Sequence, residues 1–134
     1  MATSEVIYLG TLRTKATHHL SGMEIITDAP TDNEGMGGAF SPTDMVATAL
    51  GSCMLTTMGI VARRHDIDLQ GISVSVTKVM APQPRRIAEI HIIFDWNGFI
   101  LSLDNQIRLK NAALTCPVAL SLDPEIKQVV DFGY

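Results

Sequence analysis

The two cysteines are the residues of this 134-residue chain best suited to redox chemistry. Cys53 lies in the middle of a long uncharged run, and Cys116 directly precedes a proline. A thiolate can attack the O–O bond of a peroxide and become a sulfenic acid, with which a second thiol condenses to a disulfide. Free cysteines also fill space in protein cores without reacting, so a structural role stays open for each of them.

The spacing of the cysteines excludes other common thiol sites. The chain has no Cys-x-x-Cys, which removes the thioredoxin-type motif and the standard zinc knuckle. Its four histidines are scattered, so a metal site is the weakest alternative. Pro117 disfavours helical geometry at Cys116, so this cysteine should end a helix. Free N–H groups at the start of the next helix can lower the pKa of its thiol.

The composition argues against nucleic acid as a partner and against export. The net charge is −4 and the basic pairs Arg63-Arg64 and Arg85-Arg86 are short, whereas nucleic acid binding requires basic patches. Aromatic residues are scarce, which disfavours base stacking. The first residues lack the basic and apolar segments of a signal peptide. We therefore expect a cytoplasmic protein, in which lasting disulfides are rare.

The run that carries Cys53 predicts a long helix. No charged side chain occurs from Met45 to Ala62. Ser41 is a good N-cap, Pro42 suits the first helical position, and Asp44 falls in the first turn, where a negative charge suits the helix dipole. The first charges after the run are two arginines, at the end where cations suit a helix.

The same run is just long enough to be tested as a membrane span. Small and polar residues such as Thr48, Ser52 and Gly59 dilute its hydropathy, and no other segment resembles a span. We therefore expect no membrane insertion, but a helix that is apolar on most faces and buried in a core.

The remaining elements follow from hydrophobic periodicity. β-Branched or alternating residues predict five strands, at residues 5–18, 23–27, 71–79, 86–96 and 126–132. Helical spacing returns at residues 103–116, and a short turn of helix is expected at 118–122. The glycine-rich segment 31–40 lacks the pattern of a phosphate-binding loop, so it is expected to lead into the long helix.

The order of these elements favours an α+β fold of antiparallel sheets, in one domain over residues 1–134, because the strands are joined by hairpins rather than by right-handed crossovers. About five strands in a small chain are too few to cover a long helix that is apolar on most faces. We therefore expect a dimer that shares its core.

Two segments resemble a known family. The segment Phe40–Cys53, read as FSPTDMVATALGSC, is similar to the region around the reactive cysteine of the OsmC/Ohr family, the osmotically inducible and organic hydroperoxide resistance proteins. Cys116–Leu122, read as CPVALSL, resembles the second-cysteine segment of that family. The resemblance implies an intertwined homodimer, with long central helices packed between sheets. It also implies thiol-dependent reduction of organic hydroperoxides or hydrogen peroxide in oxidative or osmotic stress, with an external thiol or dithiol as the reductant. The resemblance implies no metal and no bound organic cofactor.

The resemblance also implies roles for particular residues. By this resemblance, Cys53 corresponds to the peroxidatic cysteine of the family and Cys116 to the resolving cysteine. Arg13 is the nearest candidate for the family's arginine beside the peroxidatic thiolate. The family's peroxidases place a glutamate at the position of Thr43, where it orients that arginine, and Asp44 is expected to cap the helix instead. Two alternatives stay open: a redox-sensing or small-ligand-binding dimer of the same fold without efficient turnover, and a dimer whose cysteines belong to the core.

Overall fold

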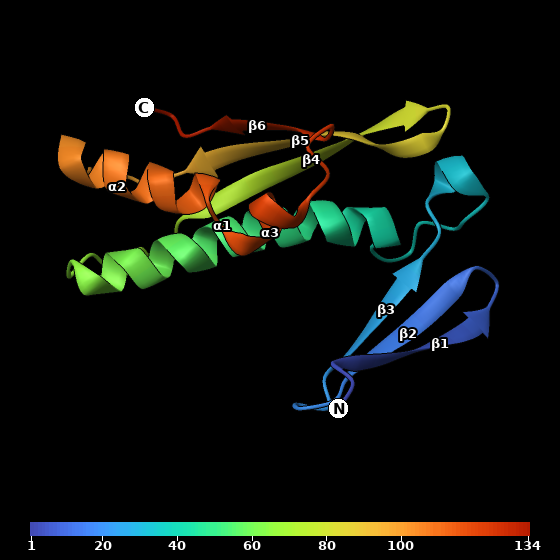
Figure 1. Cartoon of the computed structure of the whole chain (residues 1–134). Helices are drawn as coiled ribbons and strands as arrows, with labels where there is room; N and C mark the ends of the chain where they lie inside the picture. The colour runs from blue at the N-terminus through green and yellow to red at the C-terminus, as the bar shows by residue number, and fades with distance from the viewer. The chain divides into compact units, whose positions relative to one another are not determined.

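The computed structural model describes residues 1–134, which form six strands, three α-helices and one short 3-10 helix. The chain divides into two compact units, Met1–Val46 and Ala47–Tyr134, which are described separately (Figure 1). The helices and strands confirm the predicted α+β class. That the whole chain forms one domain stays a prediction.

The N-terminal unit is built on a three-stranded antiparallel sheet in the order β1 (Ser4–Gly10), β2 (Arg13–His18) and β3 (Glu24–Asp28). The prediction of one strand over residues 5–18 was wrong. The chain reverses at Thr11 and Leu12, whose φ angles are 54° and 64°. Two adjacent residues with positive φ form the tight turn that suits a hairpin, but neither is the glycine or asparagine that usually signals it.

The glycine-rich segment follows β3 and leads to the long helix as predicted, with a 3-10 turn at Thr31–Asn33. The long helix is α1 (Pro42–Arg64), which agrees with the prediction. Its start is closed by reciprocal hydrogen bonds. The Asp44 amide donates to Ser41 Oγ at 3.0 Å, and the Ser41 amide donates to Asp44 Oδ2 at 2.9 Å. This is a capping box with aspartate at the third helical position.

The C-terminal unit contains a second three-stranded sheet, in the order β4 (Ser73–Pro82), β5 (Arg85–Asp95) and β6 (Lys127–Asp131). The β4–β5 pair is antiparallel as predicted, but its strands extend further and leave a shorter loop. β6 pairs with β5 in parallel, which departs from the all-antiparallel expectation. The reason is that the chain returns to the sheet through α2 (Leu103–Leu114) and α3 (Pro117–Ser121), and such a crossover restores the strand direction.

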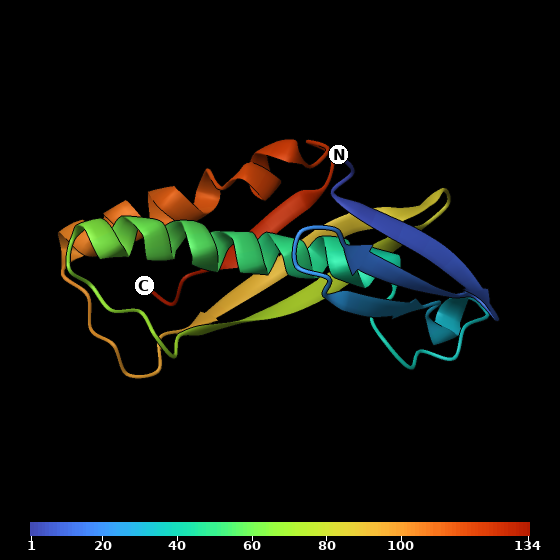
Figure 2. The same ribbon diagram turned by 90° about the horizontal axis from the view of Figure 1, so that it is seen from below.

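Two helices cover one face of this second sheet, with α2 running beside α1 (Figure 1 and Figure 2). The contact between α1 and the sheet is close at Gly51, where an added Cβ would lie 2.9 Å from a methyl group of Val76. The buried side of α1 is a single stripe, formed by Ala47, Leu50, Gly51, Met54, Met58 and Ala62. Although α1 is long and apolar enough for a membrane span, this stripe packs in the core of the unit.

The opposite face of α1 is exposed in the single chain. Ala49, Thr56 and Ile60 lie there, and the Ile60 side chain is 49% exposed. One sheet and one neighbouring helix cover only one side of α1, which agrees with the prediction that a single small chain cannot cover the whole helix.

Candidate active site

Cys53 lies near the middle of α1, at the border between the buried stripe and the exposed face. Its side chain is half-buried and packs against the hydrophobic core of the C-terminal unit. Cys53 is a free thiol. A half-buried position leaves the sulfur accessible to a small molecule while an apolar surface adjoins it.

Cys116 is the N-cap residue of α3, in extended conformation with φ −65° and ψ 151°. This position confirms the prediction that the cysteine before Pro117 lies beyond the end of a helix, since α2 ends at Leu114. The Cys116 side chain is fully buried, with an exposed fraction of 0%. The fold therefore fixes this second thiol in the core, between two helices.

The structure brings the two cysteines together. Both thiols are free, and the Cys53 thiol lies close enough to Cys116 to affect its pKa. Burial is the main cause that raises the pKa of Cys116, and the neighbouring Cys53 thiol acts in the same direction. The backbone N–H groups of Ala119 and Val118 in α3 lower this pKa, but they do not outweigh burial. The start of α3 thus lowers the pKa of Cys116 as predicted, but the net effect of all causes is a raised pKa.

Arg13 lies in the N-terminal unit, at the first position of β2. Arg13 and Asp28 are register partners across β2 and β3, and Arg13 Nη2 lies 3.2 Å from Asp28 Oδ2. The same carboxylate oxygen accepts a hydrogen bond from the Gly38 amide at 2.9 Å. The Gly38 amide and then Arg13 hold the pKa of Asp28 below its usual value, although burial opposes them.

The sequence did not reveal Asp28 as a partner of Arg13. With residues 5–18 read as one strand, the register between the two residues could not be derived. The positive φ angles at Thr11 and Leu12 create the hairpin that brings Arg13 opposite Asp28. The remaining signal in the sequence is an aspartate at the end of a strand, which is common before a turn.

Each of the other polar candidates has at least one contact with a residue nearby in the sequence. Asp44 closes the capping box of α1, as predicted, and the Thr43 hydroxyl lies 3.3 Å from the Ser41 hydroxyl. His18 Nδ1 lies 2.6 Å from Ser21 Oγ, and His19 Nε2 lies 3.8 Å from Glu5 Oε2. These contacts assign the two histidines to the ends of the N-terminal hairpins.

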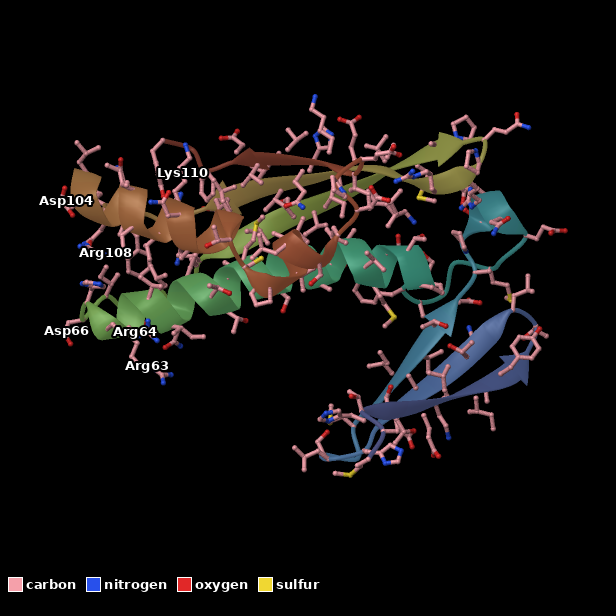
Figure 3. The ribbon with its side chains drawn as sticks, viewed as in Figure 1. Arg63, Arg64, Asp66, Asp104, Arg108 and Lys110 are labelled. Carbon is pink, nitrogen blue, oxygen red and sulfur yellow. The ribbon has the colours of Figure 1, made fainter.

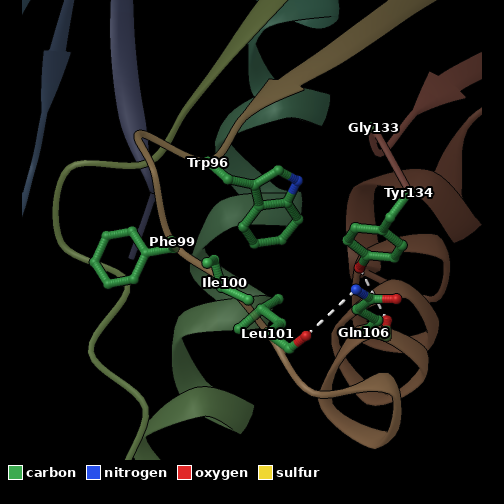
Figure 4. Close-up of a pocket in the computed structure, with 7 residues that line it drawn as sticks. All are labelled: Trp96, Phe99, Ile100, Leu101, Gln106, Gly133 and Tyr134. Carbon is green, nitrogen blue, oxygen red and sulfur yellow. Dashed lines mark hydrogen bonds between the residues drawn. The ribbon is translucent and has the colours of Figure 1, made fainter.

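A separate pocket of about 190 Å³ lies in the C-terminal unit (Figure 4). It is lined by Trp96, Phe99, Ile100, Leu101, Gln106, Gly133 and Tyr134. Its polar groups are satisfied within the chain. Trp96 Nε1 donates to the Phe132 carbonyl at 2.6 Å, and the Tyr134 hydroxyl donates to the Gln106 carbonyl at 2.9 Å. Neither cysteine lines this pocket, so it offers no thiol chemistry.

Charged side chains gather where α1 ends and α2 begins (Figure 3). The labelled residues are Arg63, Arg64, Asp66, Asp104, Arg108 and Lys110. Acidic residues are interspersed with the basic ones, so this end of the unit is not the continuous basic surface that nucleic acid binding requires.

A comparison with known protein families shows to which family the chain belongs. The family model described as OsmC-like protein matches residues 35–130, a segment that contains both cysteines. The chain belongs to the OsmC-like protein family. The match covers the helix of Cys53 and the turn of Cys116, the two segments that carried the resemblance in the sequence.

Several solved structures with the OsmC-like fold are similar to this chain over nearly its whole length. A Psychrobacter arcticus protein named for an osmotic stress induced and detoxification response is 54% identical, with a TM-score of 0.94 over 98% of this chain and 95% of that chain. An organic hydroperoxide resistance protein from Legionella pneumophila is 16% identical, with a TM-score of 0.67 over 98% and 96%. A Vibrio cholerae protein with a similar description is 18% identical, with a TM-score of 0.71 over 98% and 91%. No curated protein sequence matches the chain significantly.

Proposed function

We propose that this OsmC-like protein is a thiol-dependent peroxidase that reduces organic hydroperoxides or hydrogen peroxide. The observation that carries the proposal is the proximity of two free thiols, one half-buried and one buried. The Legionella relative is named an organic hydroperoxide resistance protein, which supports the same substrate class. The apolar surface around Cys53 favours an organic peroxide over a strongly hydrated one.

The reaction begins at Cys53. Its thiolate attacks the outer oxygen of the hydroperoxide, so that an S–O bond forms as the O–O bond breaks. The departing alkoxide takes a proton and leaves as an alcohol, and Cys53 becomes a sulfenic acid. Cys53 is suited to this step because it is the more accessible of the two thiols.

The second step takes place at Cys116. Its thiolate attacks the sulfenic sulfur, a disulfide forms, and hydroxide leaves and becomes water on taking a proton. The raised pKa of Cys116 keeps it a neutral thiol until that step, which suits a resolving rather than an attacking residue. An external thiol or dithiol then supplies two electrons and restores both thiols.

We also propose that Arg13 supplies the positive charge that stabilises the Cys53 thiolate. Asp28 holds one side of the guanidinium, and the Arg13 side chain is 40% exposed. A guanidinium has five N–H donors, so donors remain for a second anion.

The active protein is proposed to be a cytoplasmic homodimer. β1 exposes apolar side chains on both faces of its sheet, since Val6 and Tyr8 alternate with Ile7 and Leu9 and all four are exposed in the single chain. A three-stranded sheet with this exposure needs to be covered by other apolar groups. In the proposed dimer, the second copy covers this sheet and also the exposed face of α1.

Steady-state turnover tests the peroxidase proposal. The protein should consume cumene hydroperoxide when a dithiol reductant is present, and the Cys53→Ser variant should not. A burst of oxidation without turnover would instead support the redox-sensing alternative, which the burial of Cys116 favours because a buried thiol forms its thiolate less readily.

A further inference from the structure

The aromatic residues of this chain are concentrated at one end of the C-terminal unit. The whole sequence has only seven of them: four Phe, two Tyr and one Trp. Four of the seven form a continuous cluster, in which the centroids of neighbouring rings lie between 4.9 and 5.9 Å apart: Phe94, Trp96, Phe132 and Tyr134. A fifth, Phe99, lines the pocket beside them. The cluster therefore runs from the buried Phe94 to the wall of this pocket.

Three hydrogen bonds join the walls of the pocket to one another. Trp96 Nε1 donates to the Phe132 carbonyl at 2.6 Å, which ties the end of β5 to the C-terminal segment. The Tyr134 hydroxyl donates to the Gln106 carbonyl of α2 at 2.9 Å. Gln106 Nε2 donates in turn to the Leu101 carbonyl at 3.4 Å, as Figure 4 shows. The pocket is therefore formed by the chain itself, and a ligand does not have to open it.

Two bends of the backbone give the pocket its shape. Asn97 and Gly98 both have positive φ angles, of 50° and 80°, and the Phe99 amide donates to the Trp96 carbonyl at 2.9 Å, so the chain turns sharply after β5. A third bend lies at Gly133, where φ is 75°. A Cβ atom at Gly133 would lie 3.9 Å from the edge of the Trp96 ring, so a larger side chain there would extend over this ring. The glycine leaves the edge of Trp96 free.

The chemistry of the lining selects an uncharged ligand. None of the lining residues has a charged side chain, and the indole N–H of Trp96 and the hydroxyl of Tyr134 are already hydrogen-bonded within the chain. An ion entering the pocket would lose its hydration without gaining a charged partner. An apolar ring loses no hydrogen bond, and it can pack edge-to-face or offset against Trp96 and Tyr134.

The volume of the pocket limits the ligand to a single ring. The pocket has a volume of about 190 Å³. In proteins generally, an apolar cavity of about 150 Å³ is large enough to hold benzene. One six-membered ring with a small substituent therefore suits the pocket.

A second hollow on α2 provides a contrast. It is lined by Asp104, Ile107, Arg108 and Asn111 and contains no aromatic residue. Its charged side chains of both signs suit water and ions better than an apolar ring. The aromatic pocket and this hollow therefore differ in the class of molecule that they can hold.

We propose that the pocket between Trp96 and Tyr134 is a binding site for a small, uncharged molecule with one aromatic ring. This inference goes beyond the proposed peroxidase activity and does not depend on it, because neither cysteine lines the pocket.

The experiment uses the fluorescence of Trp96, the only tryptophan of the chain, as the signal. The full-length reduced protein is titrated with toluene, and separately with benzoate, which has the same ring but carries a negative charge. Toluene should change the fluorescence in a saturable way, with a dissociation constant of about 1 mM or lower, the scale expected for so small a ligand. Benzoate should bind at least about tenfold more weakly, because its carboxylate loses hydration without a charged partner.

Three variants locate the binding site. Tyr134→Phe keeps the ring and loses only the hydrogen bond to α2, so it should still bind toluene. Tyr134→Ala removes one aromatic wall and should weaken binding by about tenfold. Leu101→Phe fills part of the cavity and should also weaken binding, which provides a second test if Tyr134→Ala does not fold. Circular dichroism shows which of the variants are folded.

Ile107→Ala is the matched control. Ile107 is an exposed apolar residue of α2 that does not line the aromatic pocket, so its removal should leave the dissociation constant for toluene unchanged. A fluorescence signal that does not saturate, or benzoate binding as tight as that of toluene, would overturn the inference. Undiminished toluene binding in folded Tyr134→Ala or Leu101→Phe, or an equal loss in Ile107→Ala, would overturn it as well.

Discussion

The buried thiol of Cys116 lies close to the half-buried thiol of Cys53, across the junction of α1 with the turn between α2 and α3. This proximity depends on two local features of the sequence. The capping box at Ser41 and Asp44 fixes the start of the helix that carries Cys53, and Pro117 places Cys116 at the entry to a new helix.

Replacing Cys116 should trap the first oxidation product. In Cys116→Ser, cumene hydroperoxide should convert Cys53 to a sulfenic acid that accumulates, because the second thiol is missing. Mass measurement after trapping with dimedone should show one adduct on Cys53. Turnover should fall by at least about tenfold, since only a slower external thiol can resolve the intermediate. Turnover equal to that of the parent would contradict a resolving role for Cys116.

The disulfide-forming step should accelerate with pH over an alkaline range. Because burial and Cys53 raise the pKa of Cys116, its thiolate fraction keeps increasing beyond about pH 8.5, where an ordinary thiol is half ionised. Rapid-quench measurement of disulfide formation after sulfenic acid formation should therefore show a rate still rising at that pH. A rate that levels off below it would indicate a Cys116 thiolate stabilised by the start of α3.

The close contact at Gly51 should make this position intolerant of a larger residue. Gly51→Ala adds a methyl group 2.9 Å from Val76, and overpacking typically costs about 1–3 kcal/mol, against about 1 kcal/mol gained in helix propensity. We expect a net decrease of about 1 kcal/mol in the free energy of unfolding, measured with denaturant.

The control for this prediction is the double variant. Val76→Ala removes the opposing methyl groups, so Gly51→Ala should cost less in that background than alone. Equal costs in both backgrounds, or a stabilised single variant, would mean that α1 and the sheet do not meet closely at Gly51.

The exposed face of α1 should support dimer formation. Ile60→Asp places a charge on this face and should convert a dimer to monomers or unfold it, as measured by light scattering with size-exclusion chromatography and by circular dichroism. Ser75→Asp, at an exposed position of β4, is the matched control and should leave the dimer intact. A dimer that tolerates Ile60→Asp without change would place the interface elsewhere.

The sequence was sufficient to predict most of the helices and strands. The capping residues located α1 closely, and alternation located β4 and β5, because both signals are local. The hairpin at Thr11 and Leu12 was missed because the two residues of its turn have positive φ angles although neither is glycine or asparagine.

Two other features depend on long-range pairing. The parallel alignment of β6 follows from the path of α2 and α3, which residue periodicity does not encode. The pairing of Asp28 with Arg13 follows from the strand register, so it could not be found before the hairpin was known.

Thiol counting after stoichiometric oxidation tests the central claim most directly. The reduced protein is treated with one equivalent of cumene hydroperoxide, and its thiols and mass are measured under non-reducing conditions. We predict that two thiols are lost per chain and that the mass decreases by about two hydrogens, as an intramolecular disulfide between Cys53 and Cys116 requires. If both thiols remain, or if the single thiol of the Cys53→Ser variant is oxidised as readily, then Cys53 is not the peroxide-reactive residue of this protein.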